Sequence, residues 1–344
     1  MPSRYDVDML YICSTPYHVL VALCRIVVNK EDADIVICSD ILDGKGLTER
    51  LNASDFVKRV FFFDEADVAL TPLSSMLSKL FLRPSRTRRA VEKVLNIDVF
   101  GYRKVCIFHD VILLGRYLQD VGRDFLLLED SHDFFKTVSQ SYFGKSLPQK
   151  TIYYKLRKLL NVGYFPLGQS KYAIGVEVNS REGLEIEHRC IIECSKERLF
   201  TSISAEVFND MYMLFSYGAS LPCLSQCNNI LILTQPLWEE GLLPDKESQL
   251  KLYGNMAKNY YEQGHSVFLK PHPRDTVDYI GLSNIEGVIS AHIPIELLFL
   301  TGQARFKEIA TVFSSAAKFP LINCNLNVMG IESLKKFQSK EGDY

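Results

Sequence analysis

The chain has 344 residues, of which 47% are hydrophobic and 23% charged, and its formal net charge is -2 at pH 7. A chain of this length exceeds the size at which one hydrophobic core usually keeps growing, so we expect two domains. The small negative net charge argues against a nucleic-acid-binding protein, because such proteins carry a basic footprint.

The chain shows no sign of a membrane span or a metal site. No apolar run approaches the roughly 20 residues that a membrane helix needs, and the first residues lack a signal-peptide pattern. Most of the nine cysteines lie in strand-like or helical segments, where a reduced thiol behaves as a small apolar side chain. The pairs Cys190/Cys194 and Cys223/Cys227 lack the partner ligands of a zinc site. We therefore predict a cytoplasmic protein without a bound metal.

The first part of the chain alternates short apolar runs with helix-compatible stretches. Residues 7–14 predict a buried strand, and residues 19–28 predict a helix that follows a polar turn with Pro16 near its start. Further strands are predicted at residues 34–39, 57–64, 104–109 and 124–129, with the longest helix over residues 73–95. These strands and helices predict a Rossmann-like domain. The basic stretch over residues 83–93 is typical of a solvated helix face, with a membrane-surface patch as the alternative.

Residues 134–220 show a looser pattern, which we interpret as an excursion and linker of the same domain. Helices are predicted at residues 150–160 and 205–217, and short strands at residues 172–178 and 189–194. The N-terminal domain is therefore predicted to cover residues 1–220.

A second series of strands begins at residue 228. Strands are predicted at residues 228–237, 266–270, 287–290 and 309–313, with helices at 246–263 and 294–300 and a closing helix at 331–338. We predict a second Rossmann-like domain over residues 228–325, and a closing helix and tail over 326–344. The predicted fold class is α/β, with two Rossmann-like domains that face a cleft.

The clearest candidate site follows the predicted strand at residues 266–270. Lys270-Pro271-His272-Pro273-Arg274 lies at the carboxyl end of this strand, where open α/β sheets bind their ligands. The two prolines restrict the backbone, so His272 is held on a stiff support between two basic residues. This arrangement suits an anionic leaving group; the alternative is a surface turn.

Two other strand ends carry polar residues. Ser314 and Ser315 stand where an apolar strand gives way to a helix start, which favours a phosphate, although an ordinary serine cap is the alternative. The strand at residues 124–129 ends in Glu129, Asp130 and Ser131, which either serve a reaction or cap the following helix. The chain contains no Gly-x-Gly-x-x-Gly fingerprint, Walker loop or Gly-x-Ser-x-Gly elbow, which argues against a dinucleotide oxidoreductase, a P-loop ATPase and a serine hydrolase.

Three motifs carry a family resemblance. Lys270-Pro-His-Pro-Arg274, Pro294-Ile-Glu296 and Phe313-Ser-Ser-Ala-Ala317, in this order and at these spacings, resemble the nucleotide-binding half of the bacterial sialyltransferases of glycosyltransferase family 52 and of the related polysialyltransferases. The resemblance is clearest over residues 228–320. Glu129-Asp130-Ser131 lies where these enzymes carry an acidic pair followed by glycine, and Ser131 departs from that pattern.

The resemblance implies an inverting glycosyltransferase of the GT-B fold. Such an enzyme moves sialic acid from CMP-sialic acid to a terminal glycan hydroxyl, in capsule or lipooligosaccharide synthesis, without a metal or another cofactor. His272 would hydrogen-bond or protonate the departing phosphate, and Ser314 and Ser315 would hold that phosphate. Glu296 would accept from the ribose hydroxyls. The nucleotide-binding set is completed by Lys270, Pro273 and Arg274, of which Arg274 either adds positive potential or pairs with Asp275.

The acceptor hydroxyl also needs a base, and several acids are candidates. Asp130 is the first choice and Glu129 the second, while Glu239 or Glu240 would fill this role from the loop after the first strand of the second domain. Thr15, Tyr17 and His18 are expected to line the acceptor side, with a structural role as the alternative for His18.

Other functions remain open at this point. The nearest is transfer of another CMP-linked acidic sugar, such as a different nonulosonic acid or Kdo. A sugar-nucleotide epimerase, a uridine-diphosphate transferase and a non-catalytic glycan-binding subunit are further alternatives. Ser131 in place of glycine is the only feature that supports the non-catalytic subunit. The expected partners are a CMP-sugar donor, a glycan or glycolipid acceptor and, as in relatives, a second copy of the chain. The expected location is the cytoplasm, with the inner face of a bacterial membrane as a peripheral site.

Overall fold

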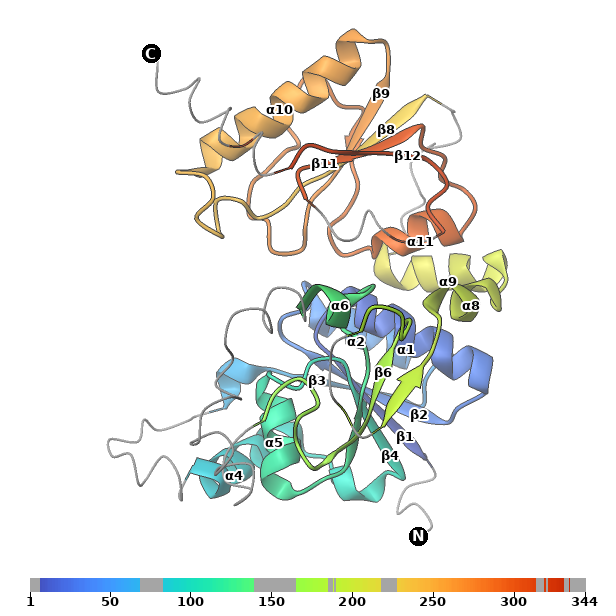
Figure 1. Ribbon diagram of the computed structural model, residues 1–344, viewed down its shortest axis with the longest axis vertical. Coiled ribbons are helices and arrows are strands. Elements are labelled where there is room, and N and C mark those ends of the chain that lie inside the picture. Colours follow the sequence, from blue (N-terminus) through green and yellow to red (C-terminus); the bar gives the residue numbers. More distant parts are fainter. Residues whose placement is uncertain are drawn as a thin grey trace. The chain divides into compact units, whose positions relative to one another are not determined.

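The chain folds into two α/β units. The structure is a computed structural model that describes residues 7–68, 83–138, 165–184, 188, 190–217, 228–313, 319, 321–330 and 334. The two compact units are Met1–Ile203 and Ser204–Tyr344, and each is described by itself (Figure 1). Each contains a parallel sheet, so the predicted α/β class with two Rossmann-like units is confirmed. The cleft of the predicted GT-B arrangement stays a prediction.

The first unit is built on a parallel sheet with the strand order β3-β2-β1-β4-β5-β6-β7. Its strands are β1 (Met9–Cys13), β2 (Ala33–Cys38), β3 (Arg59–Phe63), β4 (Lys104–Ile107), β5 (Phe125–Leu127), β6 (Ala173–Val178) and β7 (Ile191–Glu193). Its described α-helices are α1 (Pro16–Asn29), α2 (Gly44–Asn52), α4 (Arg83–Leu95), α5 (Leu113–Val121), α6 (Phe134–Val138) and α8 (Lys196–Thr201).

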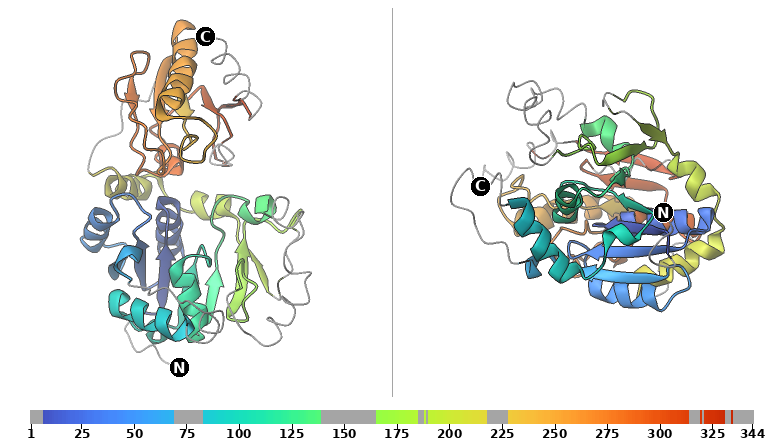
Figure 2. Two further views of the ribbon diagram at one scale, coloured as in Figure 1. Left: turned by 90° about the vertical axis from the view of Figure 1, so that its left-hand side faces the viewer. Right: turned by 90° about the horizontal axis from the view of Figure 1, so that it is seen from below.

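Helices cover both faces of this sheet (Figure 2). Successive side chains of a strand point to opposite faces, and in β1 both sets are buried. Leu10 and Ile12 enter a core that includes Val91 of α4, whereas the hydroxyl of Tyr11 accepts a hydrogen bond from Arg25 of α1. Coverage on both faces explains why the sequence of β1 is apolar throughout rather than alternating.

The short strands predicted at residues 172–178 and 189–194 are confirmed as β6 and β7, and they extend this sheet. Glu177 of β6 accepts hydrogen bonds from Arg25 (2.6 Å) and from Lys196 at the start of α8 (2.9 Å), and Lys196 is only 1% exposed. Because a buried carboxylate is tolerated only when it is paired, this network ties β6 and α8 to α1. Within the region interpreted as an excursion and linker, β6 and β7 are therefore part of the sheet of the first unit. Gly175 and Glu177 interrupt the apolar pattern that would have indicated a central strand.

The second unit contains a parallel sheet with the strand order β10-β9-β8-β11-β12. Its strands are β8 (Asn229–Leu233), β9 (Ser266–Lys270), β10 (Gly287–Val288), β11 (Glu308–Thr311) and β12 (Asn325–Val328), and its described helices are α9 (Ala205–Phe215), α10 (Lys246–Glu262) and α11 (Ile295–Leu300). Ile230, Ile232 and Leu269 pack with Leu252 and Tyr253 of α10 in the core of this unit.

Two boundaries differ from the prediction. The helix α9 was placed in an N-terminal domain of residues 1–220, but it belongs to the second unit, where it packs on α11 and Asn209 accepts a hydrogen bond from Gln303 (2.7 Å). Residues 326–344 were predicted as a closing helix and tail, but the edge strand β12 occupies their first part. All side chains of β12 are exposed, so no buried-strand pattern marked it.

Parts of three predicted helices lie outside the described residues. These parts are residues 73–82, 150–160, and 331–338 except Leu334. Within the described part of the chain, no helix has both the length and the apolar character to cross a bilayer.

Both sheets have the strand order of a doubly wound fold. The central strands β1 and β8 are each flanked by the next strand in sequence on one side and by a later strand on the other, β4 and β11 respectively. The order of connections reverses there, and in such sheets ligands bind outside the carboxyl ends of the strands at this point. The predicted polar residues that the structure describes directly after β1, β5, β8 and β9 therefore lie at the carboxyl edges of the two sheets.

Candidate active site

His272 lies on the loop that leaves the carboxyl end of β9. Its ring is partly buried, and its Nδ1 accepts a hydrogen bond from the backbone N–H of Arg274 (3.1 Å). Because an amide donates its proton at Nδ1, the proton of the neutral imidazole is on Nε2. Burial lowers the pKa of His272 to about 4, and the positive charges of Arg274 and Lys270 act in the same direction. The ring therefore presents a neutral N–H donor, which favours the predicted hydrogen bond to a phosphate over proton transfer.

A polar network beneath this loop fixes the backbone of His272. The hydroxyl of Thr234, the residue after β8, accepts from the His272 backbone N–H (3.2 Å) and donates to the carboxylate of Asp275. Asp275 also accepts from Gln249 of α10 (2.9 Å) and from the hydroxyl of Tyr279 (2.8 Å). These bonds join the ends of β8 and β9 to α10, so the position of the loop is set by the sheet and helix together.

Lys270 and Glu296 are buried polar residues of the same unit, 6% and 7% exposed. Nζ of Lys270 donates to the carbonyl oxygen of Ser290 (3.1 Å). Burial lowers the pKa of Lys270 to about 8 and raises the pKa of Glu296 to about 7, and in each case the charge of the other residue opposes the shift. Their predicted nucleotide contacts remain predictions, because little of either side chain reaches the surface.

The two acids on the loop after β8 are held by residues of the His272 loop. Arg274 pairs with Glu240 (3.0 Å) rather than with Asp275, which was one of its two predicted alternatives. Glu239 accepts from the backbone N–H of Thr276 (2.8 Å) and from its hydroxyl. Burial tends to raise the pKa of Glu239, but the hydrogen bonds from Thr276 outweigh it and the pKa is lowered. Both carboxylates are bound to residues of the His272 loop and hold it in place. This makes Glu239 and Glu240 less suitable than Asp130 as the general base.

Two members of the predicted phosphate site lie outside the described residues. Ser314 and Ser315 follow β11, and the last described residue before them is Phe313, whose backbone N–H donates to the side-chain oxygen of Gln235 (3.0 Å). Because Gln235 follows Thr234 at the end of β8, this bond holds Phe313 next to the strand that supports His272. Pro273 is partly buried in the same loop.

In the first unit, Asp130 lies in the loop after β5. Its carboxylate oxygen Oδ1 is 2.9 Å from Nε2 of His18, and a quarter of its side chain is exposed. Burial tends to raise the pKa of Asp130, but the hydrogen bond from His18 and the fields of His18 and His109 outweigh it and the pKa is lowered. An ionised, partly exposed carboxylate at a strand end is suited to accept a proton from a hydroxyl group.

Glu129, the alternative base, is more deeply buried than Asp130. It is 2% exposed, and its Oε2 accepts from the backbone N–H of Asn179 (2.6 Å) at the end of β6. Burial raises the pKa of Glu129 to about 7, although the hydrogen bond from Asn179 and the charge of Lys196 oppose the shift. This pKa suits a general base, but access to a substrate favours Asp130.

The predicted acceptor-side residues have different positions. Thr15 is the N-cap of α1, and its hydroxyl accepts from the backbone N–H of His18 (3.2 Å). His18 is fully buried, so it does not line the surface of the acceptor side as expected. Tyr17 is partly buried, and its ring meets that of His18 edge to face.

Sequence reasoning missed several residues of these two strand-end clusters. Thr234 and Asp275 support the His272 loop, and each follows an apolar strand closely enough that its position could have been noticed. His109, which follows β4, was counted within a predicted strand; burial lowers its pKa while Asp130 opposes the shift. The contact between His18 and Asp130 had no local signal, because 112 residues separate them in the sequence.

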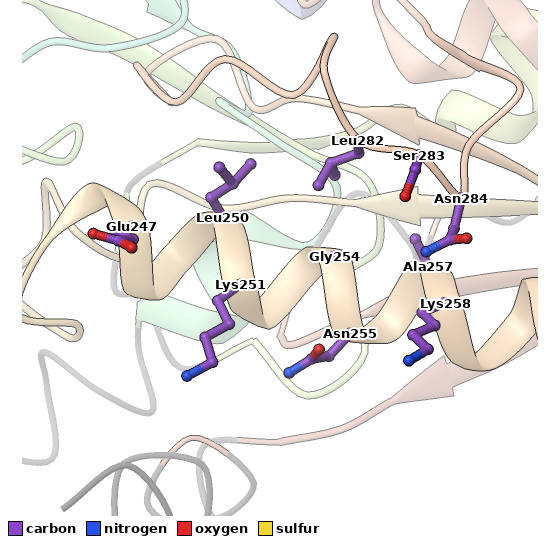
Figure 3. Close-up of a pocket in the computed structure, with 10 residues that line it drawn as sticks. All are labelled: Glu247, Leu250, Lys251, Gly254, Asn255, Ala257, Lys258, Leu282, Ser283 and Asn284. Atoms are coloured by element: carbon purple, nitrogen blue, oxygen red, sulfur yellow. The ribbon is translucent and has the colours of Figure 1, made fainter. Parts of the chain in front are cut away.

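A pocket of about 340 Å³ lies on the second unit between α10 and the loop at residues 282–284 (Figure 3). Gly254 permits the loop to approach, since a Cβ there would lie only 3.2 Å from Leu282. None of the predicted site residues lines this pocket. Within the segments that the structure describes, no three His, Cys, Asp or Glu side chains come together as metal ligands.

The glycosyltransferase family 52 model matches residues 138–332, more than half of the chain. The chain belongs to glycosyltransferase family 52. It is therefore a glycosyltransferase, which acts on a sugar donor and an acceptor. The family match includes the loops around Thr234, His272, Glu296 and the two serines, whereas Asp130 and His18 lie before it.

Similar solved structures extend over most of this family 52 chain. One is the alpha/beta-galactoside alpha-2,3-sialyltransferase of Photobacterium phosphoreum, with 15% identity and a TM-score of 0.47, covering 94% of this chain and 90% of that one. Another is Arabidopsis thaliana UGT89C1 in complex with UDP-L-rhamnose, with 9% identity and a TM-score of 0.47, covering 91% and 76% of the two chains. No curated protein sequence matches this chain.

Proposed function

We propose that this family 52 glycosyltransferase is an inverting sialyltransferase that uses CMP-sialic acid and a terminal glycan hydroxyl. The observation that carries the proposal is the loop of His272 at the carboxyl end of β9. Its imidazole has an Nε2–H donor that is set by the Arg274 backbone amide, and its backbone is anchored by Thr234. A rigid neutral donor of this kind suits the monophosphate that leaves when CMP departs.

In the proposed reaction, the oxygen of the acceptor hydroxyl attacks the anomeric carbon of the sialic acid as the bond from that carbon to the phosphate oxygen breaks. His272 stabilises the negative charge that develops on the phosphate by donating a hydrogen bond through Nε2. We propose that Ser314, Ser315 and Arg274 add donors or positive potential to the same phosphate, and that Glu296 accepts from the ribose. Pro273 restricts the backbone of the His272 loop, and Lys270 lies at the end of β9 where this loop begins.

The hydroxyl proton passes to Asp130 in this proposal. Asp130 has the more accessible carboxylate of the two neighbouring acids, 25% exposed at the side chain, whereas Glu129 is 2% exposed. Direct displacement by the acceptor inverts the anomeric configuration. A monophosphate carries less charge than a diphosphate, so hydrogen-bond donors are sufficient and we propose that neither a metal nor another cofactor is required.

The test is release of CMP from CMP-sialic acid, measured with and without a galactose-terminated acceptor. Acceptor-stimulated release is expected for the wild-type protein, and His272→Ala is expected to lower it by at least about 100-fold, since removal of one such donor typically has this effect. Ser131→Gly is the matched loop control and should keep most of the rate. A His272→Ala variant that keeps most of its rate would remove the leaving-group role.

The same assay separates the alternatives. One outcome is CMP release that is stimulated only when CMP-Kdo or another CMP-linked nonulosonic acid replaces CMP-sialic acid. This result would keep the proposed phosphate chemistry but show that the enzyme transfers a different sugar. Epimerisation or turnover of a uridine-diphosphate sugar would show that the donor is not a CMP-linked sugar. Binding of a glycan without any turnover would indicate a non-catalytic subunit.

We further propose that the acceptor belongs to a capsule or lipooligosaccharide, and that the enzyme works as a cytoplasmic homodimer at the inner face of a bacterial membrane. The support for these points is the family resemblance alone. Sedimentation of the purified protein, with and without vesicles, distinguishes a monomer from a dimer and a free protein from a membrane-bound one.

A further inference from the structure

His18 has hydrogen-bond partners at both of its ring nitrogens. It lies at the start of α1 with no exposed surface, and its ring stacks on Phe108 with centroids 4.4 Å apart and planes 6° apart. Nδ1 accepts a hydrogen bond from the backbone N–H of Ser14 (3.2 Å), and the Ser14 hydroxyl is 3.3 Å from the same atom. Because the amide can only donate, Nδ1 keeps its lone pair. Nδ1 is therefore an acceptor, and the ring presents its N–H donor at Nε2.

The Nε2–H of His18 is directed at one residue. It lies 2.9 Å from the carboxylate oxygen Oδ1 of Asp130 and 3.0 Å from the carbonyl oxygen of the same residue. One donor thus holds both the side chain and the backbone of Asp130. The donor is itself fixed by α1, the Ser14 amide and the Phe108 ring, so little freedom is left to the carboxylate.

Among the residues that the structure describes, two histidines, His18 and His109, lower the pKa of Asp130. His109, which follows β4, is the second group that lowers its pKa, and Asp40, which follows β2, interacts in turn with His109. Glu129 is the neighbouring acid in the chain, and its own interactions run to Asn179, Lys196 and Asp133 rather than to Asp130. The contact with His18 is therefore the main influence that keeps the Asp130 carboxylate ionised.

We propose that His18 is a positioning residue for Asp130: it orients the carboxylate so that one oxygen stays bound to His18 while the carboxylate accepts the proton of the acceptor hydroxyl. This inference rests on the proposed function. The proton moves from the hydroxyl oxygen to Asp130, and His18 neither gains nor loses one. His18 does not touch the substrate, and its effect on the rate passes through Asp130.

A matched pair of variants tests this role. His18→Phe keeps an aromatic ring for stacking on Phe108 but loses the donor, whereas His18→Gln keeps an N–H donor at a similar reach. In His18→Phe, the acid limb of kcat/KM should move to higher pH by about one to two units, because a hydrogen bond to a charged group is lost. His18→Gln should restore most of the wild-type profile, and KM for the donor should change little in either variant.

A double-mutant cycle with Asp130→Asn separates positioning from a general structural role. His18→Phe should lower kcat about 10- to 100-fold in the wild-type background and by less than about 3-fold in the Asp130→Asn background. Equal factors in both backgrounds would overturn the inference, as would an unchanged pH profile in a folded, active His18→Phe protein.

A carboxyl ¹³C NMR titration of Asp130 provides a readout that does not depend on activity. The pKa of Asp130 should lie below its ordinary value in the wild-type protein and rise in His18→Phe. If the wild-type protein transfers no sugar from any CMP-linked donor, the proposed function is wrong. The positioning role of His18 in catalysis then also fails, even when the titration confirms its contact with Asp130. If the wild-type protein is active and the titration is identical in both proteins, only the inference about His18 fails.

Discussion

At the scale of single residues, the two neighbouring acids after β5 have opposite environments. Glu129 is buried and has a pKa raised to about 7, whereas Asp130 is partly exposed and has a lowered pKa. A base must first reach the proton that it accepts, and only then does its pKa decide its efficiency. Accessibility therefore supports the proposal that Asp130 accepts the proton, whereas the carboxylate of Glu129 is bound to the Asn179 amide at the end of β6.

Asparagine and glutamine variants of these acids should separate their roles. Asp130→Asn is expected to lower kcat by about 10²- to 10⁴-fold, the usual contribution of general base catalysis. Glu129→Gln should stay within about 10-fold of the wild-type rate, because the amide oxygen of glutamine still accepts the Asn179 hydrogen bond. Steady-state kinetics with saturating donor measure both. A larger loss for Glu129→Gln than for Asp130→Asn would transfer the role of base to Glu129.

The ring of His272 should make stability depend on pH in a defined direction. Its pKa of about 4 in the folded protein lies below the ordinary value of 6.5, so the unfolded chain binds the proton more readily as the pH falls from about 6.5 towards 4. Relative to His272→Gln, the wild-type protein should lose about 1–2 kcal/mol of unfolding free energy between pH 7.5 and pH 5. Urea unfolding of both proteins at the two pH values measures the difference. If the difference in unfolding free energy between the two proteins stayed constant over this pH range, the ring of His272 would have to be exposed to solvent.

At the scale of elements, the site of the second unit depends on how β8, β9 and α10 are joined. Thr234 at the end of β8 bonds the backbone of His272 and the carboxylate of Asp275, and Asp275 is held in turn by Gln249 of α10. The loop therefore moves only if a strand end or the helix moves. Rigidity of this kind benefits catalysis, since a displacement of about 1 Å can cost about 100-fold in rate.

Substitution of Thr234 tests this anchoring. Thr234→Val keeps the shape of the side chain but removes the hydroxyl, which leaves the His272 amide and Asp275 each short of a partner. We expect a loss of about 1–3 kcal/mol in unfolding free energy and a fall in kcat of about 10- to 100-fold with little change in KM. Thr234→Ser is the matched control and should remain close to wild type. Equal behaviour of the two variants in denaturation and kinetics would show that the hydroxyl has no anchoring role.

At the scale of the whole molecule, each unit has its own sheet and its own core. In a doubly wound sheet, ligands bind at the carboxyl ends of the strands. The side chains at this edge differ between the two units. The edge of the second unit carries His272, the proposed hydrogen-bond donor to the phosphate, and that of the first carries Asp130, the proposed base. The proposed reaction requires both sets of groups to act on the same donor and acceptor.

Nucleotide binding should therefore affect one unit first. CMP is expected to slow backbone hydrogen exchange at residues 234–240 and 270–276 of the second unit, and to leave the loop of Asp130 unchanged when no acceptor is present. At about 100 times its Kd it should add about 2.7 kcal/mol of stability, well above the effect of UDP or GDP at the same concentration. Hydrogen-exchange mass spectrometry and thermal unfolding measure these effects. Protection confined to the first unit, or a larger shift with UDP, would contradict the assignment of the nucleotide site.

The sequence by itself determined the class of the fold, most of the strands and the candidate nucleotide loop. Buried parallel strands are apolar along their whole length, and the prolines around His272 restrict the backbone whatever its surroundings, so both features are local. The tertiary structure alone decided that β6 and β7 join the first sheet, that Arg274 pairs with Glu240, and that His18 holds Asp130. These outcomes depend on residues far apart in the chain, which meet only when the sheet aligns the ends of its strands, and no local pattern records such contacts.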